Sequence, residues 1–190
     1  MKLSILSLIF ALLSTNFAIG QSLPTDKRTG EIVYTDVILF DTLIASKAYT
    51  QMLDFIKNNP KKNSNIQSDD QQRVITFTTI NKASHLYPNQ IGYVKSDVVL
   101  TFLSNKFSYR IANFSHIPMN MTTPCTNNLN AKKPTCFVDK SPKKYWKEVK
   151  KGTAKAMHDY IMKLIFVTLE DQPTRKTLRI DEYFLARNWK

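Results

Sequence analysis

The sequence predicts an α+β fold in which helices pack on one face of a curved antiparallel β-sheet. Three observations predict it. A segment rich in β-branched residues precedes a segment with helical spacing, several alternating segments follow, and a long amphipathic segment comes near the end. The order is therefore β-α-β(n)-α, and two layers bury its apolar faces most simply. A chain of 190 residues is long enough for one domain with a core.

The N-terminal segment predicts export. Residues 1–20 combine a positive Lys2, an apolar run, and the small residues Ala18 and Gly20 just before Gln21. These features together are typical of a secretory signal peptide. The apolar run is shorter than the roughly 20 residues that a membrane-spanning helix needs. We therefore predict that residues 1–20 are a signal peptide, and that the mature chain is periplasmic or secreted and has no transmembrane segment.

The next part of the chain predicts one strand and one helix. Residues 21–30 are a polar leader. Residues 31–40 carry apolar β-branched side chains on both faces, which predicts a well-covered strand. Apolar residues recur every three or four positions over residues 44–60, which predicts an amphipathic helix. Ser46 is the expected N-cap of this helix, and Pro60 ends it.

Four further segments predict antiparallel strands. Residues 74–79 alternate as a strand, and a short partner is expected to start at Ile66, with a turn at Asp69. Residues 93–104 and 107–114 also alternate and flank a short turn, which predicts a β-hairpin. These segments supply most of the expected sheet.

A helix of about 25 residues is predicted from Pro142 onwards, with Ser141 as N-cap and Pro173 as its latest end. Its apolar stripe comprises Trp146, Val149, Thr153, Ala156, Tyr160, Leu164 and Val167. Its other face carries Lys147, Lys150, Lys151 and Lys155. We predict a single domain over residues 31–170 and a C-terminal tail over residues 171–190.

The two cysteines of the chain, Cys125 and Cys136, stand at the ends of one polar loop. In an exported protein, two cysteines are more often a disulfide than a metal or redox pair. The C-x₂-C spacing of many zinc sites is absent, and no histidine stands nearby in the sequence. We therefore predict a disulfide that closes the loop 125–136 and constrains the unfolded chain by about 3 kcal/mol. The loop is either a structural staple or a fixed binding loop.

Composition and charge limit the classes of partner. The formal net charge is +12 at pH 7, and the chain has only four glycines, so a glycine-rich phosphate loop is not expected. A basic cytoplasmic protein would suggest nucleic acid, but export argues against that partner. The anionic partners expected outside the cytoplasm are glycans, lipid head groups and acidic proteins. The alternative is that the basic surface only keeps the protein soluble.

No catalytic motif is present. The three histidines are scattered, and no metalloprotease, nucleophile-elbow or EF-hand pattern occurs. We therefore predict a non-enzyme with no catalytic residue, no metal site and no cofactor. The enzymatic alternative requires polar groups from distant positions, such as Asp36, Arg110 and His116, to meet in a cleft.

The sequence thus predicts an exported, non-catalytic binding or interaction module. An apolar ligand carried between the sheet and the C-terminal helix is the alternative function, because a long helix across a curved sheet can enclose a cavity. Seven basic or aromatic residues on the hairpin and on the long helix are the candidate binding residues: Tyr109, Arg110, His116, Trp146, Lys147, Lys150 and Lys151.

Three stretches, GEIVYTDVI, IQSDDQQRVI and KFSYRIANFSH, give the chain a resemblance to a known family. With the helix between the first two, they resemble an exported domain-of-unknown-function family with a TATA-binding-protein-like (TBP-like) fold, common in Bacteroidetes. The resemblance covers about residues 30 to 117. It implies the fold and an exported setting, but no established activity, cofactor or substrate, because function lies in sites rather than in folds.

Overall fold

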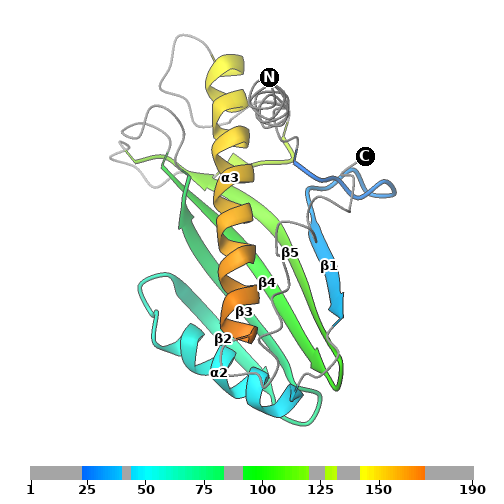
Figure 1. Ribbon diagram of the computed structural model, residues 1–190. Coiled ribbons are helices and arrows are strands. Elements are labelled where there is room, and N and C mark those ends of the chain that lie inside the picture. Colours follow the sequence, from blue (N-terminus) through cyan, green and yellow to red (C-terminus); the bar gives the residue numbers. More distant parts are fainter. Residues whose placement is uncertain (1–22, 40–43, 84–91, 120–126, 132–141, 170–190) are drawn as a thin grey trace, which may run out of the picture.

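The computed structural model describes residues 23–39, 44–83, 92–119, 127–131 and 142–169. These residues form the predicted α+β fold, a curved antiparallel sheet of six strands with two helices on one face (Figure 1). In chain order the elements are β1 (Tyr34–Leu39), α2 (Ala45–Lys57), β2 (Asn63–Asp69), β3 (Val74–Lys82), β4 (Tyr93–Leu103), β5 (Lys106–Ile117), β6 (Asn127–Asn128) and α3 (Pro142–Leu169).

The predicted β4–β5 hairpin lies at the centre of the sheet. The strand order is β1-β5-β4-β3-β2. The short strand β6 pairs with β5 at Ser115 and His116, beyond the part of β5 that pairs with β1. Phe102 stands directly opposite Phe107, and their ring centroids lie 5.1 Å apart. Along β4 every second side chain from Val94 to Phe102 is buried, because these side chains face the helices. The alternation that predicted the hairpin is therefore also what builds the core.

Helix α3 lies across the sheet on the stripe that its sequence predicts. Trp146, Val149, Thr153 and Leu164 are buried, and Met157 adds to the same face. The Thr153 hydroxyl donates to the Val149 carbonyl 2.8 Å away, so this buried polar group is satisfied within the helix. Helix α2 contacts both α3 and β4, and the two helices form one layer.

Three sequence expectations need correction. The strand over residues 31–40 is not well covered, because β1 lies at the edge of the sheet and exposes Val37 and Leu39. Helix α2 begins with Ile44 as N-cap, without a side-chain cap, and Ser46 lies inside the first turn. The helix starts earlier because Ala45 is already buried against the sheet. The polar leader is also more ordered than expected: Thr25 pairs with Ile32 around a turn in which Gly30 has a φ of +70°. The predicted end of α2 is confirmed, since Asn58 is its C-cap.

Several predicted features lie outside the described residues: the signal peptide, the C-terminal tail, and both cysteines with their predicted disulfide. No disulfide is shown in the part of the chain that the structure describes. Within that part, neither helix combines the length and the apolar character that a membrane crossing requires.

The sheet face that the helices leave uncovered carries a polar ladder centred on Asp97. The two carboxylate oxygens of Asp97 accept hydrogen bonds from Thr78 and from Asn113, each 2.9 Å long. Asn113 has a φ of +56° beside the β-bulge that separates Lys95 and Asp97 in the β4–β5 register. The bulge therefore turns the side-chain amide of Asn113 on β5 toward the carboxylate of Asp97 on the neighbouring strand β4.

Candidate functional site

Three of the predicted binding residues lie in the core. Tyr109 is 3% exposed and packs against Phe107, with ring centroids 6.2 Å apart. His116 is fully buried, and its ring meets Trp146 edge-on at a centroid distance of 6.0 Å. The Trp146 Nε1 donates to the carbonyl of Ala131 at 3.0 Å. The structure thus brings His116 and Trp146 together, but away from solvent.

The four charged candidates lie on separate surfaces. Arg110 is exposed on the face of β5 opposite to Tyr109, and so on the uncovered face of the sheet. Lys147 is exposed on α3, and Lys151 forms an ion pair with Glu148 at 3.3 Å. Lys150 is half-buried on the same helix. The seven candidates therefore do not form one site.

The enzymatic alternative required Asp36, Arg110 and His116 to meet. Asp36 lies opposite Tyr109 in the β1–β5 register and shares its face, and His116 is buried on that face as well. Arg110 points to the other face. The sheet itself therefore separates Arg110 from His116, and this constellation does not form.

The space between the sheet and α3, where an apolar ligand would lie, is filled by side chains. Phe102, Phe107 and Phe114 from the hairpin, with Met157 and Leu164 from α3, are each less than 2% exposed. The pocket that the structure shows beneath α3 is lined mainly by polar and charged residues, with apolar surface between their polar groups.

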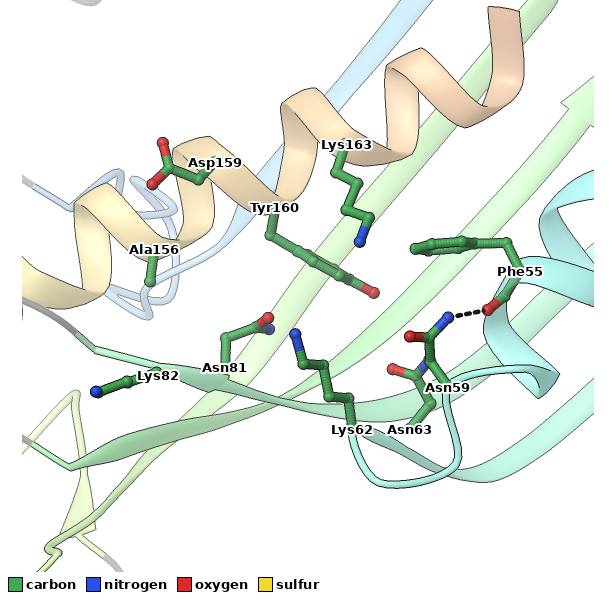
Figure 2. A pocket seen from close by; sticks show the side chains of 10 residues that line it. All are labelled: Phe55, Asn59, Lys62, Asn63, Asn81, Lys82, Ala156, Asp159, Tyr160 and Lys163. Atoms are coloured by element: carbon green, nitrogen blue, oxygen red, sulfur yellow. Dashed lines mark hydrogen bonds between the residues drawn. The ribbon is translucent and has the colours of Figure 1, made fainter. Parts of the chain in front are cut away.

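This pocket of about 200 Å³ lies where four segments meet: the end of α2, the α2–β2 connection, the end of β3 and the middle of α3 (Figure 2). Its wall is polar except for Phe55 and Ala156. We refer to it as the α2–α3 pocket. None of the seven candidate residues lines it.

Positive charge dominates the α2–α3 pocket. In Figure 2 the ammonium groups of Lys62 and Lys163 point toward its middle, whereas Lys82 points away. The Lys163 ammonium lies 4.9 Å from the centroid of the Phe55 ring, in a cation–π contact. No carboxylate of a described residue forms an ion pair with Lys62 or Lys163. The acidic residue of the wall, Asp159, instead pairs with Lys155 outside the pocket at 2.8 Å.

Two residues that line the pocket each carry a fully buried polar atom without a hydrogen bond of normal geometry to any described residue. These atoms are the Tyr160 hydroxyl and the Asn63 Oδ1. Burial raises the pKa of Tyr160 above its ordinary value, and a smaller effect of the neighbouring Thr79 opposes it. Tyr160 is therefore a neutral O–H donor at physiological pH. Because buried polar groups are normally paired, two such atoms on residues that line one pocket mark a place for a bound water or a ligand.

The α2–β2 connection holds its side of the pocket in place. The Asn59 Nδ2 donates to the Phe55 carbonyl at 2.7 Å, and the Asn59 carbonyl accepts from the backbone N–H groups of Lys62 and Asn63, both at 3.0 Å. The Lys62 carbonyl in turn accepts from Ile80 of β3 at 2.8 Å. These hydrogen bonds fix the backbone of the connection and the side chain of Asn59.

Sequence reasoning missed this pocket. The stretch KKNSN (residues 61–65) has the composition of a polar connection, and Tyr160 belongs to the predicted apolar stripe of the long helix. One signal was available: a tyrosine on a buried stripe needs a partner for its hydroxyl. That the partner region is the α2–β2 connection follows only from the packing of α3.

Comparisons with known proteins show the fold. No protein-family model matches the chain, and no curated protein does. Among solved structures, it is similar to a TBP-like protein from Parabacteroides distasonis ATCC 8503, with a TM-score of 0.63 at 12% identity over 80% of this chain and 100% of that one. It is also similar to a DUF4468 family protein from Bacteroides ovatus ATCC 8483, with a TM-score of 0.57 at 12% identity over 85% and 97%. The TBP-like fold predicted from the sequence is therefore confirmed.

Proposed function

We propose that this protein is an exported, non-catalytic binding module that recognises an anionic ligand in the α2–α3 pocket. One observation carries the proposal. Lys62 and Lys163 face a pocket whose two buried polar atoms, on Asn63 and Tyr160, lack partners among the described residues. Two cations that no described carboxylate neutralises favour a negatively charged occupant.

The pocket wall supports binding rather than catalysis. The residues that line it are lysines, asparagines, one aspartate, one tyrosine, one phenylalanine and one alanine. Catalytic sites typically pair a nucleophile or a general base with a second group that orients it. The acidic group of this wall, Asp159, is exposed and paired with Lys155, so it is not arranged for such a task.

The test separates the pocket from the general basic charge. The purified protein is assayed for binding to three anionic polymers or surfaces: polygalacturonate by affinity electrophoresis, anionic phosphatidylglycerol vesicles by co-sedimentation, and polyglutamate by affinity electrophoresis. The pocket variant is Lys62→Ala with Lys163→Ala. The control is Lys147→Ala with Lys150→Ala, which removes the same charge from another part of α3.

We expect the wild-type protein and the control to bind at least one of the three probes equally well, and the pocket variant to lose at least tenfold in affinity. Equal loss in both variants would assign binding to diffuse charge, and loss in the control alone would assign it to the face of α3 predicted from the sequence. Either result, or no binding of the wild-type protein to any probe, overturns the proposal.

A further inference from the structure

The two unpartnered atoms of the α2–α3 pocket specify opposite hydrogen-bonding needs. The Asn63 Nδ2 donates to the Ile56 carbonyl at 3.0 Å, which fixes the orientation of the amide and leaves its Oδ1 as an acceptor without a donor. The Tyr160 hydroxyl has Thr79 as a neighbour but donates no hydrogen bond of normal geometry to a described residue. A complementary ligand must therefore both donate to Asn63 and accept from Tyr160.

Charge adds a third requirement. Lys62 and Lys163 offer only donors, and both ammonium groups face the pocket. A bare anion such as sulfate or a carboxylate satisfies the two lysines and Tyr160, but it leaves the Asn63 acceptor unpaired. A neutral polyol satisfies Asn63 and Tyr160, but it gains nothing from the two lysines, which are exposed to solvent. A hydroxylated anion meets all three requirements.

We propose that the α2–α3 pocket binds an acidic sugar, a pyranose unit that carries a carboxylate. The carboxylate lies between Lys62 and Lys163, and ring hydroxyls pair with Asn63 and Tyr160. The amides of Asn59 and Asn81, which also border the pocket, both donate and accept, as sugar hydroxyls require. This inference rests on the proposed function, since it names the ligand class of the same site.

The other two anionic classes fit less well. A glutamate side chain presents acceptors without a hydroxyl donor beside them, and the glycerol hydroxyls of phosphatidylglycerol stand on a flexible chain beside the phosphate. A uronate places hydroxyl donors and the carboxylate on one rigid ring. The pocket of about 200 Å³ lies below the 300–1,000 Å³ of pockets for drug-sized ligands, so a single sugar unit is the appropriate size of ligand.

The test uses three small probes that separate charge from hydroxyl groups. Isothermal titration calorimetry measures the dissociation constants of methyl β-glucuronide, of methyl β-glucoside, and of acetate. The two glycosides differ only in the carboxylate, and acetate carries the charge without a ring. We expect the glucuronide to bind at least tenfold more tightly than either of the other probes, because acetate lacks the hydroxyl groups and the glucoside lacks the carboxylate that the two lysines would hold.

Tyr160→Phe removes one hydroxyl and keeps the ring, so the fold is preserved. We expect it to weaken glucuronide binding about threefold to tenfold, the equivalent of one hydrogen bond. Lys147→Ala, on the same helix, is expected to leave the affinity unchanged. The natural ligand is either a polysaccharide or a single acidic sugar, and an oligosaccharide with an internal glucuronate distinguishes the two. If it binds more tightly than the glucuronide, the ligand is a polysaccharide; equal affinity indicates a single unit.

Acetate or the glucoside binding within threefold of the glucuronide would overturn the sugar assignment. Full affinity in Tyr160→Phe would overturn the proposed contact. If vesicles or polyglutamate bind to the wild-type protein but not to the Lys62→Ala, Lys163→Ala variant, and the glucuronide does not bind, the sugar inference fails and the proposed function stands. If no anion shows binding that depends on Lys62 and Lys163, both the sugar inference and the proposed function fail.

Discussion

Replacing Tyr160 by phenylalanine is expected to stabilise the protein while it weakens ligand binding. The Tyr160 side chain is 9% exposed, and its hydroxyl makes no hydrogen bond of normal geometry with a described residue. A buried hydroxyl without a partner costs about 1–3 kcal/mol. Because Thr79 lies close enough to influence the Tyr160 pKa, we take the lower end of that range. Tyr160→Phe should therefore raise the free energy of unfolding by about 1 kcal/mol.

Tyr49→Phe is the matched control. The Tyr49 side chain is also buried, at 6% exposed, but its hydroxyl donates to the Asp70 carboxylate. Loss of that bond should cost about 1 kcal/mol rather than add stability, a value discounted because Asp70 is exposed to solvent. The two substitutions make the same chemical change, so they should move stability in opposite directions.

Urea unfolding followed by circular dichroism, without ligand, measures both variants. The expected increase for Tyr160→Phe corresponds to a rise of about 2–4 °C in the melting temperature of a domain of this size. A loss of 1 kcal/mol or more in Tyr160→Phe would show that its hydroxyl has a structural partner, and would refute the reasoning that assigns it to a ligand.

Three other predictions concern stability. Gly92→Ala should cost more than about 2 kcal/mol in urea unfolding, because Gly92 has a φ of +92° and a Cβ there would overlap the Ile117 carbonyl; Gly30→Ala, with a φ of +70° in open space, should cost about 1 kcal/mol. Asp97→Ala should cost about 1–2 kcal/mol, because it leaves two side-chain donors without acceptors. Above about pH 10 the free energy of unfolding should fall, because the unfolded chain releases the Tyr160 proton while burial keeps it bound in the native state. Tyr160→Phe should make the fall of this free energy with pH less steep, by up to about 1.4 kcal/mol per pH unit. Stability independent of pH from 10 to 12 would contradict this assignment.

Periodicity was sufficient to predict the layers. The alternation of β4 and β5 and the stripe of α3 are local patterns, and each places its apolar residues on the face that the structure buries. The same patterns did not predict the β-bulge at Asn113, because a bulge depends on pairing between strands. They also did not fix the start of α2, where burial of Ala45 decides.

The site was harder to predict, because residue type does not reveal exposure. His116 and Trp146 are polar or aromatic residues typical of binding sites, yet they pack against each other in the core. Conversely, Lys62 and Asn63 stand in a stretch that resembles a polar connection, and they become part of a pocket only where Tyr160 of α3 meets them. That meeting is a long-range contact, and local sequence patterns carry no information about it.

Binding of an acidic sugar in the α2–α3 pocket can be located residue by residue with a titration followed in ¹H–¹⁵N correlation spectra. Methyl β-glucuronide is added to the labelled protein, and each backbone amide shift is recorded. We expect saturable shifts that cluster in the α2–β2 connection, at the end of β3 and in the middle of α3, and that disappear in Lys62→Ala with Lys163→Ala. Shifts that cluster on the uncovered face of the sheet around Arg110, or that spread over all lysine-bearing surfaces without saturation, would contradict binding in this pocket.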